Sequence, residues 1–80
     1  MVVDKRVLDI RKRAAKEIIT LLNSSGSSGV FGDSIALMVL DNHGLNKRFS
    51  EEYLGLLVSS GVAERVILNN TYVYRIKNKQ

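Results

Sequence analysis

The sequence predicts a single small α+β domain in which three helices are followed by a C-terminal β-hairpin. Apolar residues recur at a spacing of three and four over about residues 3–23, which is typical of an amphipathic helix. Two further apolar segments, about 34–42 and 47–60, each end close to a glycine, as helices commonly do. The segment of about 62–77 contains two β-rich runs joined by an asparagine pair, which indicates a hairpin.

Length and composition indicate a binding module rather than an enzyme. Residues 1–80 make one domain, with a core large enough to fold alone but too small to enclose a deep active site as well. The chain has no cysteine and one histidine, which excludes disulfides, thiolate metal sites and most zinc sites. No Ser/His/acid set or phosphate-cradling loop is present. We therefore expect no enzymatic activity, no cofactor and no metal.

The distribution of apolar and charged residues gives an expectation for location and partner. No run approaches the roughly 20 apolar residues of a membrane span, so we expect a cytoplasmic protein without a membrane partner. The net charge is +4. Residues 1–29 carry six cations and three anions, residues 30–61 carry two and four, and residues 62–80 carry four and one. The basic ends suit DNA or RNA, although a balance of this size also occurs in proteins that bind neither.

The first helix is expected over about 3–23, with a flexible loop after it. Its cations Lys5, Lys12 and Lys16 fall opposite the apolar face. Arg13 and Glu17 have the spacing of an ion pair within the helix. Residues 24–29, Ser-Ser-Gly-Ser-Ser-Gly, offer nothing to bury and predict a flexible loop.

The second helix is expected over about 34–42. Val30 and Phe31 before it can form a short strand or anchor the helix. Asp33 or Ser34 suits the N-cap, and Gly44 suits a left-handed C-cap. His43 is interpreted as a turn residue, because a lone histidine before a glycine is rarely a catalyst or ligand.

The third helix, about 47–60, admits two starts. With Asn46 as the N-cap, Lys47 and Arg48 lie in the first turn, and Phe49 and Leu56 point away from the core. Glu52 falls on the same outward side.

The second possible start of this helix has Ser50 as the N-cap. Glu51 and Glu52 would then stabilise the positive end of the helix dipole, and Phe49 would pack on Leu54 as a hydrophobic staple. Both starts remain open from the sequence.

The hairpin turn is expected at Asn69-Asn70, because asparagine tolerates the positive φ angles of a two-residue turn. Pairing through this turn sets Ile67 opposite Tyr72 and Val66 opposite Val73.

The predicted elements follow the order helix, loop, helix, tight turn, helix and hairpin. The segment "LGLLVSSGVAERVILNNTYVYRI" also contains a residue pattern that accompanies this order. The pattern consists of two leucines three apart, a glycine four further on, an apolar residue, and a hairpin closing on two apolar positions: Leu54, Leu57, Gly61, Val62, Tyr74 and Ile76. Over about residues 34–76 the chain resembles the winged helix-turn-helix family. The resemblance implies binding of double-stranded DNA by a homodimeric transcriptional regulator, with the third helix in the major groove and the hairpin on the backbone.

The resemblance and the residue types together define candidate nucleic-acid-binding residues. They lie at the start of the third helix, at the hairpin turn and after the hairpin: Lys47, Arg48, Ser50, Asn69, Asn70, Thr71 and Lys77. Arg48 can bind a guanine edge through two hydrogen bonds. A Lys-Arg pair in a turn is, however, often only solvated surface, and the asparagines have a sufficient role in turn geometry.

A second class of function remains open, a winged-helix protein-interaction subunit of a nucleic-acid-processing complex. Its candidate partner surface consists of Phe49, Tyr53 and Leu56. If these residues form an exposed stripe, protein binding is favoured; if they are buried, DNA binding remains the leading hypothesis.

Overall fold

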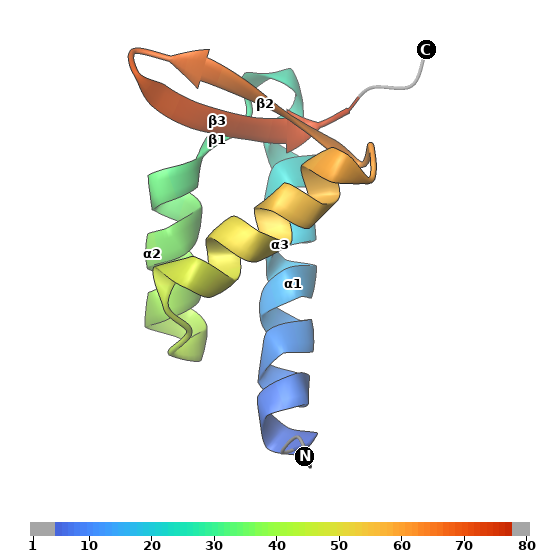
Figure 1. Ribbon diagram of the computed structural model, residues 1–80, viewed down its shortest axis with the longest axis vertical. Coiled ribbons are helices and arrows are strands. Elements are labelled where there is room, and N and C mark those ends of the chain that lie inside the picture. The colour runs from blue at the N-terminus through green and yellow to red at the C-terminus, as the bar shows by residue number, and fades with distance from the viewer. Residues whose placement is uncertain (1–4, 78–80) are drawn as a thin grey trace.

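The computed structural model describes residues 5–77 as three helices and a three-stranded antiparallel sheet (Figure 1). The elements are α1 (Lys5–Ser25), the 3₁₀ helix η1 (Gly26–Ser28), β1 (Val30–Phe31), α2 (Gly32–His43), α3 (Lys47–Ser59), β2 (Ala63–Leu68) and β3 (Thr71–Ile76). The predicted α+β class is confirmed.

The sheet, with strand order β1-β3-β2, lies across one end of the helices (Figure 1). Helix α1 ends at the sheet, and its N-terminal part extends beyond the other two helices. Helices α1 and α2 run in opposite directions. One core joins all three helices to the sheet, through Ala14, Ile18, Leu22, Ile35, Val39, Leu54, Leu57, Ala63 and Tyr74.

Residues 24–29, predicted as a flexible loop, are instead mostly helical. Helix α1 continues to Ser25, two residues beyond its predicted end, and η1 follows directly. The hydroxyl of Ser24 donates to the carbonyl of Thr20 at 2.9 Å, and that of Ser25 donates to the carbonyl of Leu22 at 2.9 Å. Both hydroxyls thus bond carbonyls of the preceding turn of the same helix, which accommodates the two serines at the C-terminal end of α1. The predicted start at residue 3 lies outside the described residues.

The glycine that ends this segment allows close contact with the sheet. Gly29 has a φ of +76°, and a Cβ there would lie 2.7 Å from Cγ1 of Val73 and 2.9 Å from the carbonyl oxygen of Tyr74. Arg75 also donates to the carbonyl of Ser27 at 3.2 Å. The Ser/Gly composition here therefore permits tight packing against β3 and not only backbone freedom.

Helix α2 begins at Gly32, earlier than predicted. Neither Asp33 nor Ser34 is its N-cap; that position is Phe31, whose side chain makes no capping hydrogen bond. The reason is that β1 pairs with β3, so the chain turns from an extended residue directly into the helix. The C-terminal prediction is confirmed: Gly44 has a φ of 69° and its N–H donates to the carbonyl of Leu40.

The predicted hairpin forms as two of the three strands of the sheet. Ile67 pairs with Tyr72 and Val66 pairs with Val73, in the predicted register. The turn asparagines have positive φ angles of 52° and 62°, as the two-residue turn requires.

Candidate nucleic-acid interface

Helix α3 begins after Asn46, and this resolves the two possible starts. The side chain of Asn46 accepts a hydrogen bond from the backbone N–H of Phe49 at 3.3 Å. The alternative N-cap, Ser50, lies inside the helix, and the helix ends at Ser59, one residue before the predicted end. Gly61, with a φ of +83°, then closes the helix, as its N–H donates to the carbonyl of Val58.

Ser50 was a candidate for nucleic-acid contact, and its position contradicts that role. It is only 1 % exposed, and its hydroxyl is buried without a hydrogen-bond partner. The start at Asn46 places Ser50 on the same helix face as Leu54 and Leu57, which are buried in the core. Its hydroxyl is therefore directed into the protein.

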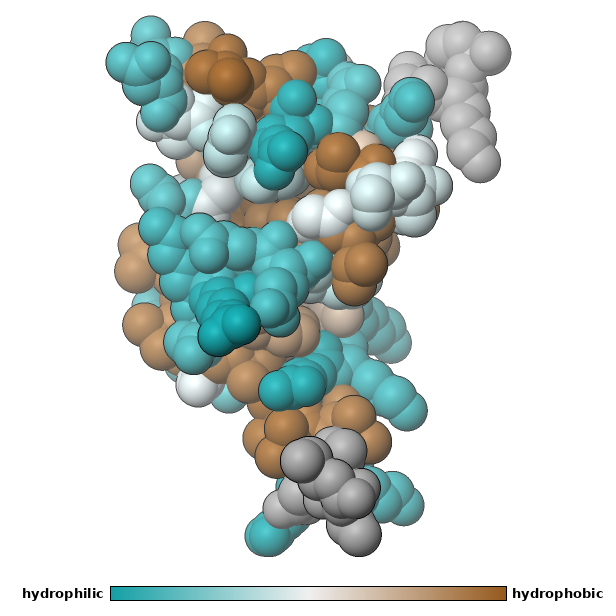
Figure 2. All heavy atoms as spheres, viewed as in Figure 1, coloured by the Kyte–Doolittle hydropathy of each residue, from teal (hydrophilic) through white to brown (hydrophobic). Residues whose placement is uncertain are grey.

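The outward face of α3 is open to solvent. The side chains of Arg48 and Glu52 are 82 % and 67 % exposed, and Arg48 Nε lies 3.3 Å from Glu52 Oε2. Leu56 is 65 % exposed one turn further along. Figure 2 shows hydrophilic residues over the N-terminal half of this helix.

Phe49 does not point away from the protein as the start at Asn46 predicted. Phe49 and Tyr53 are half-buried, pack against the core and stack on one another, with ring centroids 6.1 Å apart. Both rings line the same groove as Arg11 of α1. Of the proposed partner surface, Leu56 is exposed, whereas Phe49 and Tyr53 are half-buried.

A hollow of about 290 Å³ between α2, α3 and the hairpin turn is lined by several of the candidate nucleic-acid-binding residues. Lys47, Asn70 and Thr71 line it. Asp33 and Glu51 also line it, and Lys47 Nζ lies 3.9 Å from Asp33 Oδ1. The carboxylates offset the positive charge of Lys47 at the place where the hairpin turn approaches α3.

A second groove, of about 490 Å³, lies on the other side of α3. Arg48 and Arg11 line it with the stacked Phe49 and Tyr53, and with Leu56. Arg11 was not among the candidate residues predicted from the sequence, which treated it only as one of the charges of α1. Arg11 lies four residues before Ala15 and three before the buried Ala14, so a cation on the apolar face was the signal available.

The remaining candidates lie apart from these two hollows. Lys77 follows the far end of the hairpin; its backbone N–H donates to the carbonyl of Val62 at 2.9 Å, and it is exposed. Asn69 is exposed at the turn. Beside the turn the exposed hairpin residues are mainly apolar or aromatic: Val66, Ile67, Leu68 and Tyr72. The predicted residues thus do not form one continuous basic surface.

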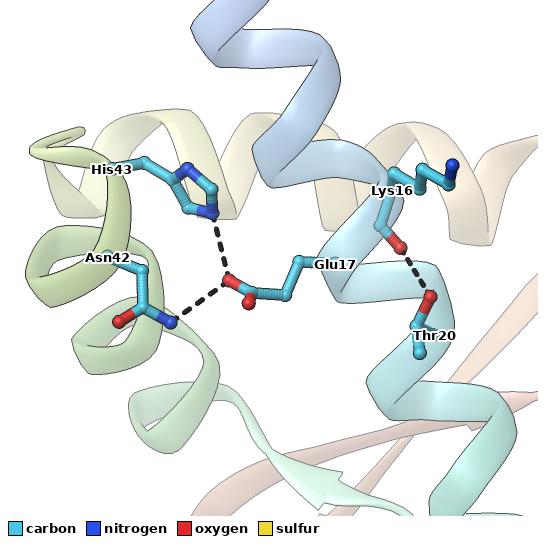
Figure 3. Close-up of polar contacts among 5 residues, drawn as sticks. All are labelled: Lys16, Glu17, Thr20, Asn42 and His43. Atoms are coloured by element: carbon cyan, nitrogen blue, oxygen red, sulfur yellow. Dashed lines mark hydrogen bonds and ion pairs between the residues drawn. The ribbon is translucent and has the colours of Figure 1, made fainter.

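A polar contact between α1 and α2 fixes the helix that leads into α3 (Figure 3). The amide of Asn42 donates to Glu17 Oε1 at 3.1 Å, and Nε2 of His43 lies 2.9 Å from the same oxygen. The predicted pairing of Glu17 with Arg13 is therefore replaced by a contact between helices. The hydrogen bond from Asn42, and to a lesser degree that from His43, lowers the pKa of Glu17 below its ordinary value.

Residues 5–77 contain no group of three or more His, Asp or Glu side chains that could hold a metal ion. No helix in this part of the chain is long and apolar enough to cross a membrane.

Comparisons of this chain with protein-family models, with curated proteins and with solved structures gave no match.

Proposed function

We propose that the three helices and the β2–β3 hairpin form a winged helix-turn-helix domain that binds double-stranded DNA. The arrangement of the elements supports this proposal. Helices α2 and α3 are joined by a short turn through Gly44, and the Asn70 and Thr71 end of the hairpin lies beside the start of α3. A helix and a hairpin are thus presented side by side.

The observation that carries the proposal is the uncovered outward face of α3. A helix is about 10–12 Å wide and the major groove of B-DNA is about 12 Å wide, so such a face can enter the groove. Arg48 is the first candidate for a base contact, since it is highly exposed on this face and within reach of a guanine edge in that pose. It would exchange its contact with Glu52 for the base.

The other contacts in this proposal are to the DNA backbone. Asn69 and Asn70 would donate to phosphate or sugar from the hairpin turn, and Lys77 would contribute charge. One domain offers few base contacts, so we propose a homodimer that binds two half-sites and acts as a transcriptional regulator.

The test is selection from random DNA duplexes, followed by binding measurements on the selected and random duplexes at several salt concentrations. We expect affinity for random duplex to fall steeply with salt, with a log-log slope of several units. Arg48→Ala should reduce the preference for the selected sequence by about 1–3 kcal/mol. Lys77→Ala should weaken binding to all duplexes equally and reduce the salt slope by about 1.

Two outcomes would contradict DNA binding as proposed. A binding affinity that is insensitive to salt would exclude phosphate contacts as its basis. Equal, sequence-independent losses in the Arg48 and Lys77 variants would remove Arg48 as a base reader.

A second candidate function is supported by Leu56. This residue is 65 % exposed at the edge of the groove with Phe49 and Tyr53, and the neighbouring Glu52 compensates the charge of Arg48. Such a surface suits a protein partner in a nucleic-acid-processing complex. A pull-down with wild-type protein and Leu56→Asp tests this: loss of a partner with unchanged DNA binding would favour the interaction function.

A further inference from the structure

The apolar face of α1 continues beyond the part of the protein that covers it. Ala14, Ile18 and Leu22 on this face are 0 % exposed. Val7, two turns before Ala14, is 37 % exposed, and the adjacent Leu8 is 42 % exposed. Figure 1 shows this end of α1 beyond α2 and α3. The face that builds the core therefore presents uncovered apolar side chains at its N-terminal end.

The charge of this helix end restricts its partner. Residues 5–16 contain six cations and one anion, Asp9. Two copies of this segment packed on one another would bring like charges together, which opposes association. A partner surface should instead be apolar and acidic.

Helix α2 carries a surface of this kind, on the side away from the core. Leu37 and Leu40 are 60 % and 50 % exposed there, beside a shallow hollow of about 430 Å³. Asp33 and Asp41 follow the same face at either end, at spacings of four residues from Leu37. Asp33 is near Lys47, whereas Asp41 is exposed and makes no ion pair with another described residue. Figure 2 shows hydrophobic residues on the flank of α2 and at the lower end of α1.

We infer that a second copy of this chain docks the N-terminal end of its α1 on the outer face of α2. Leu8 packs on Leu37 and Leu40 in this contact, and Lys12, one turn after Leu8 at the edge between the apolar and the basic sides of α1, meets Asp41. The spacing matches, since Lys12 follows Leu8 by four residues and Asp41 follows Leu37 by four, about 6 Å along each helix. The two helix segments therefore run in the same direction. Lys47 at the Asp33 end disfavours the opposite direction.

The contact can form twice between two copies. Within one copy α1 and α2 are antiparallel (Figure 1). If α1 of each copy runs parallel to α2 of the other, the two α1 helices are antiparallel, as a twofold axis across them requires. The result is a closed dimer, and the outward face of α3 takes no part in the contact.

This inference extends the proposed function, because it names the surface that would join the two copies of a regulator. The association itself does not need DNA. If the protein does not bind DNA, the dimer can still form. If the protein does not dimerise, DNA binding by the monomer can still be measured.

Sedimentation equilibrium of the full chain without DNA tests the inference. The wild type should pass from a monomer of 8.9 kDa to twice that mass as its concentration rises. Asp41→Lys and Lys12→Glu alone should each raise the dissociation constant at least about tenfold, because each introduces like charges into both contacts. An equimolar mixture of the two variants should recover the wild-type constant, since every contact in the mixed dimer pairs opposite charges.

Matched controls apply the same charge changes elsewhere. Glu52 lies on the outward face of α3 and Lys77 follows the hairpin. Neither Glu52→Lys nor Lys77→Glu should therefore change the dissociation constant of the dimer more than about twofold. Circular dichroism should show unchanged helix content in all four variants, since the four side chains are exposed.

Three results would overturn the inference. The first is a wild type that remains monomeric at millimolar concentration. The second is association that is unaffected by Asp41→Lys and strengthened by Lys12→Glu, which would indicate pairing of α1 with α1. The third is a mixture of variants that associates no better than either variant alone.

Discussion

The two faces of α3 differ in what they do, although they alternate along one 13-residue helix. The inner face buries Ser50, Leu54 and Leu57 against the core, whereas the outer face exposes Arg48 and Leu56. A step of two residues, from Leu54 to Leu56, changes the exposed fraction from 2 % to 65 %. Substitutions on this helix should therefore separate cleanly into those that change stability and those that change binding.

The largest expected effect comes from removing the buried leucine. Leu54→Ala should lower the free energy of unfolding by about 2–5 kcal/mol, because it removes apolar contacts and leaves a cavity. Leu56→Ala is the matched control, with the same chemical change on the exposed side, and should change it by less than about 0.5 kcal/mol. Urea unfolding followed by circular dichroism measures both. Similar losses in the two variants would show that the faces are not distinct.

A smaller effect is expected at the buried serine. Ser50→Ala should raise the free energy of unfolding by about 1 kcal/mol, because the buried hydroxyl has no hydrogen-bond partner and alanine favours the helix. The control is Ser59→Ala near the helix end, where an exposed hydroxyl donates to the carbonyl of Leu56 at 3.2 Å. Its effect should stay within about 0.5 kcal/mol. Destabilisation by Ser50→Ala would mean that this hydroxyl is satisfied in solution.

The smallest effect on the free energy of unfolding is expected from the polar contact of Glu17, which lies between α1 and α2 and away from α3. The Asn42 and His43 contacts lower the pKa of Glu17 below its ordinary value of 4.5. A lowered pKa in the folded state stabilises the protein above the unfolded-state pKa, and this contribution is lost as the pH falls through the folded-state pKa. Since the Glu17 side chain is 38 % exposed, we expect less than about 1 kcal/mol.

The measurement is urea unfolding of wild type and Glu17→Gln at pH 6 and pH 3. The wild type should be the more stable of the two at pH 6, and the difference should shrink at pH 3, because Glu17 then binds a proton more readily in the unfolded state, where its pKa is ordinary, than in the folded state. A difference of the same size at both pH values would show that the charge of Glu17 does not contribute.

Much of the fold could be predicted because local patterns agree with the tertiary structure. The three-four spacing in α1 identified the buried Ala14, Ile18 and Leu22, although Val7 and Leu8 of the same pattern are exposed. The leucines of α3 are buried and Gly44 ends α2, as predicted. The asparagine turn fixed the register of the hairpin, since a two-residue turn leaves one pairing. The candidate site was less predictable, because the residues chosen by type lie around different hollows: Lys47 with Asn70 and Thr71, Arg48 with Arg11, and Lys77 beyond the hairpin.

The stretch from Asn46 to Tyr53 shows where the sequence alone was insufficient. Asn46 and Ser50 are both good N-caps, and the acidic pair after Ser50 favoured the later start locally. The hydrogen bond from the backbone N–H of Phe49 to Asn46, with Ser50 buried inside the helix, decides for the earlier start.

The sequence by itself determined the three main helices and the two hairpin strands, since periodicity, caps and turns act over a few residues. The tertiary structure alone decided the role of residues whose partners are far away in the chain. It joined Glu17 to Asn42 and His43, packed Gly29 against β3, and packed Phe49 against the core. Such contacts depend on how the elements pack together, and no local pattern encodes that packing.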